Sequence, residues 1–154
     1  MSAALTIWID ADACPGMIKE VVFRAANRLK VPVILVANKP IHTPRSAFIS
    51  SLVVAKGPDV ADALIVDRVA QQDLVITADI PLADLIVKKG ATALNPRGEL
   101  YTEENVREKL SIRNFMTEMR GSGLVGGGPP PLNERDKQVF AGAFDRILTK
   151  KMRT

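Results

Sequence analysis

Two aspartates near the start of the chain are the first residues that could do chemistry. Asp10 and Asp12 follow a short apolar run at residues 7–9, and Pro15 comes three residues later. The run is typical of a buried strand, and proline suits the first turn of a helix. If residues 10–12 continue the strand, both carboxylates point the same way, and they repel unless a cation or proton lies between them. This segment therefore predicts a metal or proton site.

A second segment repeats this form. Asp79 follows the apolar residues 74–77, and Pro81 then opens a helix. Open parallel sheets bind ligands at the carboxyl ends of their strands, so Asp10 and Asp79 are expected at one edge. Asp62 lies at the start of another predicted helix, and Asp84 could reach the same edge of the sheet from the helix after Asp79. We expect these carboxylates to form one acidic site.

Magnesium or manganese is the cation that such a site would hold. Both ions prefer oxygen ligands, and they need no histidine or cysteine, of which this chain has one each. Two such ions about 4 Å apart can activate a water and stabilise the leaving oxygen during phosphodiester cleavage. The residue types therefore indicate phosphoryl chemistry, with Asp10, Asp62, Asp79 and Asp84 as candidate metal ligands.

Alternating strand and helix signals must position these residues. Strands are expected at residues 7–9, 31–37, 48–55, 74–77 and 91–94, and helices at 15–29, 59–70, 81–89, 102–110, around 112–119 and from 133. Asp59 is expected to cap the second helix, with Asp62 completing a capping box. This order predicts an α/β fold with an open parallel sheet of four or five strands and helices on both faces.

We expect a single domain over residues 1–154. Residues 1–95 would form the α/β core, and residues 96–154 a helical extension that contains a Gly/Pro-rich connection at 121–131. The chain shows no apolar run of about 18–20 residues and no basic region followed by an apolar one, so we expect a cytoplasmic protein without a membrane span. The oligomeric state stays open, a homodimer included.

The basic balance of the chain permits contact with RNA or DNA. The formal net charge is +4 and the sequence pI is about 9.4. Candidate contacts to substrate phosphates are Lys39, Arg45, Arg97, Arg113 and Arg120.

The single cysteine and the single histidine are interpreted as structural. Cys14 follows the two aspartates, and a thiol at a helix start can have a lowered pKa. However, His42 lies in a distant loop and nothing places it beside Cys14. We therefore interpret Cys14 as a buried packing residue and His42 as a loop residue.

The acidic pattern resembles that of PIN domains, a nuclease fold. The match consists of Asp10 at the first strand end and the segment ADALIVDRVAQQDLVITAD at residues 61–79. The resemblance implies that Asp10, Asp62 and Asp79 form the acidic cluster. PIN domains also use a mid-chain acid, for which Glu20 and Asp59 are the candidates here.

A closer resemblance is to the YaiI/YqxD family of uncharacterised bacterial proteins, which are regarded as PIN-like. Four separated motifs carry it: DADACP, TADIPLA, NPRG followed by YTEEN, and GGGPPP followed by D-x-x-x-F at residues 136–140. The resemblance covers almost the whole chain. It implies a fold and a set of aspartates without naming a reaction.

Three functions remain open on the sequence. The first is a magnesium- or manganese-dependent nuclease in which Asp10, Asp62 and Asp79 hold metal, and Asp12 and Asp84 assist. The second is a phosphatase of the haloacid dehalogenase type, with Asp10 as nucleophile, Asp12 as general acid/base and the later pair Asp79 and Asp84 on magnesium. The third is a non-catalytic RNA- or nucleotide-binding protein that keeps the fold.

Overall fold

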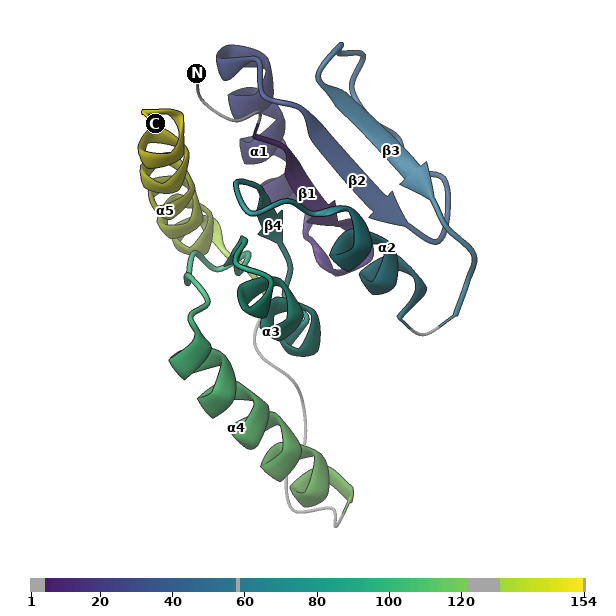
Figure 1. Ribbon diagram of the computed structural model, residues 1–154, viewed down its shortest axis with the longest axis vertical. Coiled ribbons are helices and arrows are strands. Elements are labelled where there is room, and N and C mark those ends of the chain that lie inside the picture. The colour runs from purple at the N-terminus through teal and green to yellow at the C-terminus, as the bar shows by residue number, and fades with distance from the viewer. Residues whose placement is uncertain (1–4, 58, 122–130, 154) are drawn as a thin grey trace.

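A five-stranded parallel sheet forms the centre of the molecule in the computed structural model (Figure 1). The structure describes residues 5–57, 59–121 and 131–153, the side chains of residues 13 and 113–121 excepted. The strand order is β3-β2-β1-β4-β5. The strands are β1 (Ile7–Asp10), β2 (Val33–Ala37), β3 (Ile49–Val53), β4 (Leu74–Ile76) and β5 (Thr92–Leu94). The predicted α/β fold with an open parallel sheet is confirmed.

Helices cover both faces of the sheet, as predicted. They are η1, a 3-10 turn (Ala11–Ala13), α1 (Gly16–Leu29), α2 (Val60–Arg68), α3 (Ile80–Lys88), α4 (Glu103–Gly121) and α5 (Glu134–Met152). Helices α1 and α5 pack on one face, and α2, α3 and α4 pack on the other. Among the described residues, no helix combines the length and apolar character needed to cross a bilayer.

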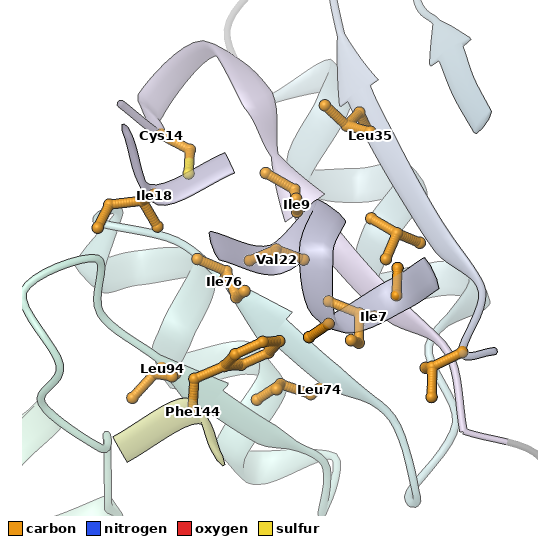
Figure 2. Close-up of a cluster of buried hydrophobic side chains, with 14 of the residues drawn as sticks. Ile7, Ile9, Cys14, Ile18, Val22, Leu35, Leu74, Ile76, Leu94 and Phe144 are labelled. Atoms are coloured by element: carbon orange, nitrogen blue, oxygen red, sulfur yellow. The ribbon is translucent and has the colours of Figure 1, made fainter. Parts of the chain in front are cut away.

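The side chains of β1 alternate between the two faces of the sheet, as in any strand, and both sets are buried because β1 lies between β2 and β4 in the middle of the sheet. Ile7 and Ile9 belong to the α1/α5 cluster, in which Phe144 of α5 is buried (Figure 2). Trp8 points to the opposite cluster and is 5% exposed, which confirms the prediction of a buried strand at residues 7–9. The last helix therefore packs on the same strands that carry the first aspartate.

Two local predictions were wrong, and that for Asp59 was confirmed only in its position. Residues 11–13 form a 3-10 turn rather than extended chain, so Asp10 and Asp12 do not alternate along a strand. Asp59 occupies the N-cap position of α2 but has a left-handed backbone with φ of 65°, and its side chain accepts no capping hydrogen bond. A side-chain cap normally needs an extended residue at that position. Finally, the segments 102–110 and 112–119 are parts of one continuous helix, α4.

Candidate acidic site at the carboxyl edge of the sheet

Asp10 and Thr77 face each other at the carboxyl ends of neighbouring strands. The parallel register pairs Ile9 with Ile76, which places the next residue of each strand at the same level. The Thr77 hydroxyl donates to Asp10 Oδ2 over 2.9 Å. The oxygen of the Thr77 hydroxyl in turn accepts from the backbone N–H of Asp79 over 2.9 Å. Thr77 is fully buried. One threonine hydroxyl therefore connects the two aspartates that the sequence motifs predicted.

The turn after Thr77 presents Asp79 at the start of α3. Its side chain is the N-cap and accepts from the Leu82 N–H over 2.9 Å. This bond holds the Asp79 carboxylate at the mouth of the candidate site, which is the opening at the carboxyl edge of the sheet. The positive end of the helix dipole favours the negative charge of Asp79 there.

The Asp10 carboxylate is buried but has few hydrogen-bond donors. It is 5% exposed, and Thr77 is its one described side-chain partner. Every fully buried side-chain oxygen or nitrogen among the described residues has a partner, so the second Asp10 oxygen must reach the surface of the mouth. Burial raises the pKa of Asp10 above its ordinary value, the Thr77 hydrogen bond lowers it, and the charges of Asp79 and Asp12 raise it further.

Asp62 belongs to the same electrostatic cluster. It lies in the first turn of α2 and is half-buried. Partial burial, followed by the charges of Asp79, Asp10 and Asp59, raises the pKa of Asp62 to about 6. The cluster therefore consists of carboxylates from the end of β1 and the starts of α2 and α3, and their negative charges repel one another. None of the ion pairs described for residues 5–57, 59–121 and 131–153 involves an acid of this cluster.

The other predicted carboxylates have separate partners. Asp12 is exposed on η1, and its Oδ2 accepts from the backbone N–H of Asn38 over 3.1 Å, which links it to the end of β2. Asp84 forms an ion pair with Lys88 over 2.9 Å within α3. Its charge is not among the causes that shift the pKa of Asp10 or Asp62. The structure thus brings Asp12 to the rim of the cluster and leaves Asp84 with Lys88.

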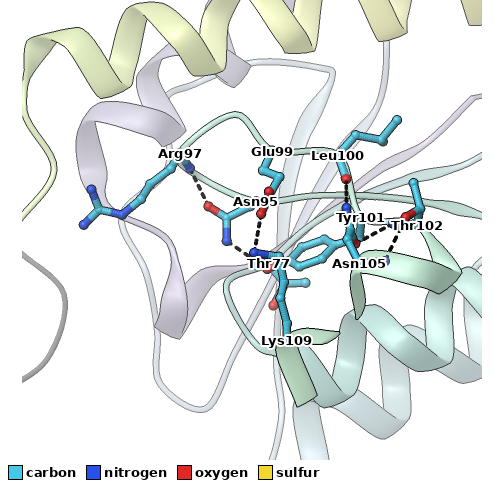
Figure 3. Close-up of polar contacts among 9 residues, drawn as sticks. All are labelled: Thr77, Asn95, Arg97, Glu99, Leu100, Tyr101, Thr102, Asn105 and Lys109. Carbon is cyan, nitrogen blue, oxygen red and sulfur yellow. Dashed lines mark hydrogen bonds and ion pairs between the residues drawn. The ribbon is translucent and has the colours of Figure 1, made fainter. Parts of the chain in front are cut away.

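A polar support behind the site was missed by sequence reasoning. The Tyr101 hydroxyl donates to the Thr77 carbonyl oxygen over 3.2 Å and accepts from Asn95 Nδ2 over 2.8 Å (Figure 3). Asn95 also donates its backbone N–H to the Glu99 carbonyl oxygen. The residues after β5 therefore hold the strand end that carries Thr77. The sequence signal was weak, since Thr77 resembled an ordinary strand residue.

The predicted phosphate contacts are dispersed. Lys39 and Arg45 are exposed in the loop between β2 and β3, and Lys39 directly follows Asn38 at the rim. Arg97 forms an ion pair with Asp136 at the start of α5 over 3.0 Å. The side chains of Arg113 and Arg120 lie outside the described residues.

Cys14 behaves as a packing residue. It is buried in the α1/α5 cluster beside Ile18 (Figure 2). Burial raises the pKa of its thiol to about 12, so the thiolate needed for nucleophilic attack is scarce at neutral pH. His42 is exposed in the β2–β3 loop, as expected for a loop residue.

The donor set suits a divalent cation in charge and atom type. The site supplies carboxylate oxygens from Asp10, Asp62 and Asp79, and their like charges repel one another. Among the described residues, no three His, Cys, Asp or Glu side chains are close enough to hold one ion together. Magnesium, however, keeps several waters and is commonly bound through one or two carboxylates. The residues therefore fit a hydrated ion better than a fully protein-bound one.

The chain matches one described family along most of its length. The model of the "Uncharacterized BCR, YaiI/YqxD family" matches residues 8–150. A UPF0178 protein of Trichlorobacter lovleyi is 58% identical over 97% of both chains. UPF0178 proteins of Dechloromonas aromatica and Yersinia enterocolitica are 54% and 56% identical over at least 95% of each chain. No solved structure matches the chain.

Proposed function

We propose that this chain, which belongs to the YaiI/YqxD family, is a magnesium- or manganese-dependent phosphodiesterase that cuts RNA or DNA. One observation carries the proposal. Asp10, Asp62 and Asp79 come from three separate elements, and their charges repel one another at the carboxyl edge of the sheet. Asp10 does so while almost completely buried. Such an arrangement costs stability in the absence of a cation, which is the mark of a site kept for binding.

The resemblance to PIN domains supports the same assignment. Asp10, Asp62 and Asp79 match the acidic positions of that nuclease fold, and these are the residues with interacting charges. Asp59, a candidate for the mid-chain acid, also contributes its charge to Asp62. In this proposal one or two of Asp10, Asp62 and Asp79 contact a hydrated ion directly, and the remaining carboxylate interacts with it through its coordinated waters.

Each acidic residue has a distinct task in the proposed reaction. A bound ion would neutralise charge and activate the attacking water. Asp10, oriented by Thr77, directs its free oxygen into the mouth, and Asp79 is fixed there by its capping bond with Leu82. In the metal-free protein, burial and the charges of Asp79 and Asp10 raise the pKa of Asp62 to about 6, and a bound cation would favour its ionised form as a ligand. Asp12 sits at the rim, next to the Asn38 backbone, where it can influence substrate approach.

Cleavage of a labelled single strand tests the proposal. A 5′-fluorescent 20-nucleotide RNA and the matching DNA are incubated with the full-length protein and Mn²⁺ or Mg²⁺, with EDTA as the metal-free arm. We expect cleavage only with the metal, and loss of at least 100-fold in Asp79→Asn. Asparagine is also a good N-cap, so α3 should keep its start.

Asp67→Asn is the matched control, because Asp67 is an exposed acid in the last turn of α2, at the opposite end of that helix from Asp62. It should cut as fast as the wild type. Equal cleavage by the wild type and Asp79→Asn would contradict the proposal. Retention of uncut RNA by both proteins would support the binding alternative, and phosphate release from small phosphomonoesters would support the phosphatase alternative.

A further inference from the structure

A groove between α1 and α5 carries positive charge away from the acidic site. Its volume is about 540 Å³, and it is lined on the α1 side by Arg24 and Arg28 and on the α5 side by Lys137. Arg146 does not line the groove but lies beside it, with its guanidinium 3.4 Å from the point where a side chain on Gly142 would begin.

Small residues form the floor of this groove. Ala25 of α1 and Ala141 and Gly142 of α5 line it, so the two helices leave space where larger side chains would fill it. The buried Phe144 and Leu148 close the bottom. The result is a channel with an apolar base and cationic walls, rather than a flat basic surface.

The positive charge of the groove is poorly neutralised. Its one acidic lining residue is Asp145, which lies 3.8 Å from Arg28, and both side chains are about two-thirds exposed. A pair this exposed contributes little. Among the described residues, Arg24, Lys137 and Arg146 take part in no ion pair. The groove thus has an excess of cations that a polyanion can neutralise.

The two helices that form the groove both begin near the carboxyl edge of the sheet. Helix α1 begins just after η1, which follows Asp10. Helix α5 begins near the same edge, because Asp136 in its first turn pairs with Arg97, which follows β5. Arg24 lies about two helical turns into α1. A strand that follows the two helices toward their N-termini would therefore approach the edge of the sheet that carries Asp10.

We propose that the α1–α5 groove binds the phosphate backbone of single-stranded nucleic acid, as a second contact outside the acidic site. The choice of nucleic acid as the polyanion rests on the proposed function. Base identity should matter little, because arginine and lysine side chains that contact phosphates read charge rather than sequence. RNA and DNA share this phosphodiester chemistry, so both should bind.

Binding without cleavage tests the groove separately from the acidic site. The anisotropy of a fluorescent 20-nucleotide oligouridine is measured in EDTA with the full-length protein. The triple variant Arg24→Gln, Arg28→Gln, Lys137→Gln should weaken binding at least 10-fold at about 0.1 M salt. The slope of log affinity against log salt should fall by about 2, since each lost contact to a single strand removes about 0.7.

A control triple removes the same charge from the opposite face. Arg68, Lys88 and Arg107 lie on α2, α3 and α4, and their replacement by glutamine should weaken binding less than 3-fold. Equal weakening by both triples would overturn the proposal, because binding would then follow net charge alone. Unchanged affinity in the groove triple would also overturn it.

A steric variant tests the groove without changing charge. Gly142→Leu should fill the floor and weaken binding at least 5-fold, while Gly142→Ala should have little effect. Leucine favours helix more than glycine does, so α5 should keep its fold. Metal-dependent cleavage of short strands should persist in these variants. If the wild type cuts neither RNA nor DNA but its binding still depends on the groove residues, the proposed function is overturned and the proposal for the groove is supported.

Discussion

Two buried aspartates at opposite edges of one sheet differ in how their carboxylates are satisfied. Asp73 precedes β4 at the amino edge and is 4% exposed, and Asp10 ends β1 at the carboxyl edge and is 5% exposed. Asp73 accepts from the Thr6 N–H over 3.0 Å, from Trp8 Nε1 over 3.1 Å and from the Ala70 N–H over 2.9 Å. Among the described hydrogen bonds, the Asp10 side chain accepts one, from the Thr77 hydroxyl.

The difference separates a structural carboxylate from a candidate functional one. Three N–H donors replace the water that Asp73 loses on burial, and they join β1 to β4 and to the turn after α2. Asp10 lacks such compensation and faces the charges of Asp79 and Asp12. Burial alone therefore does not identify a site. The balance of donors and neighbouring charges does.

Matched asparagine substitutions should show this difference most strongly. Asp73→Asn replaces one acceptor oxygen with an NH₂ group that must face N–H donors, so the free energy of unfolding should fall by about 2–4 kcal/mol. Asp10→Asn removes a charge that burial disfavours, and an amide oxygen can still accept from Thr77. Its free energy of unfolding should change by less than about 1 kcal/mol, toward greater stability.

Urea denaturation followed by circular dichroism measures both variants in metal-free buffer. Equal destabilisation by Asp73→Asn and Asp10→Asn would break the comparison, because Asp10 would then be a structural residue as well.

Sequence patterns predicted one of these aspartates and not the other. The form of strand, aspartate and helix-starting proline identified Asp10 and Asp79, since it depends on local signals. Asp73 falls between the helix predicted at residues 59–70 and the strand predicted at 74–77, and its partners Thr6 and Trp8 are more than 60 residues away in the chain. Long-range partners of this kind leave no local pattern.

The same limit explains the errors around the site. The strands and most helices followed from apolar runs and punctuating prolines, and all five strands were found. The direction of the Asp12 side chain depended on whether residues 11–13 were extended, which the 3-10 turn decided. The contact of Tyr101 with Thr77 depends on how the residues after β5 return to the sheet, which periodicity does not report.

Thr77→Val should give the next largest effect and shows whether one hydroxyl organises the candidate site. Valine keeps the volume but leaves Asp10 without its donor and the Asp79 N–H without its acceptor. The free energy of unfolding should fall by about 1–2 kcal/mol. The rise in melting temperature on adding Mn²⁺ should also be lost, because Asp10 is no longer oriented. Thr77→Ser, which keeps the hydroxyl, should retain the Mn²⁺ response. If Mn²⁺ raises the melting temperature of Thr77→Val as much as that of the wild type, the role of Thr77 is limited to stabilising the fold.

The pH dependence of stability gives the smallest expected effect and tests the charge cluster directly. The pKa of Asp62 is about 6 in the folded protein against an ordinary value of 3.8, so between these values the folded state binds more protons than the unfolded state. Stability of the metal-free protein should therefore fall as pH rises from about 4 to 6, and this contribution should level off above pH 6. A shift of about two units corresponds to at most about 3 kcal/mol. Solvent screening of a half-buried group reduces this to about 1 kcal/mol, or about 2–4 °C in melting temperature.

Scanning fluorimetry of Asp62→Asn against wild type, in EDTA and across this pH range, isolates the contribution. The fall should be smaller in Asp62→Asn, in which Asp10 still contributes because its pKa is also raised, and it should be unchanged in Asp67→Asn, an exposed acid on the same helix. Mn²⁺ competes with protons for the ionised cluster, so its stabilising effect on the wild type should grow as pH rises through 6. A Mn²⁺ effect that is constant from pH 4 to 7 would mean that the ion binds elsewhere. Asp10 would then differ from Asp73 in its electrostatics without being a metal ligand.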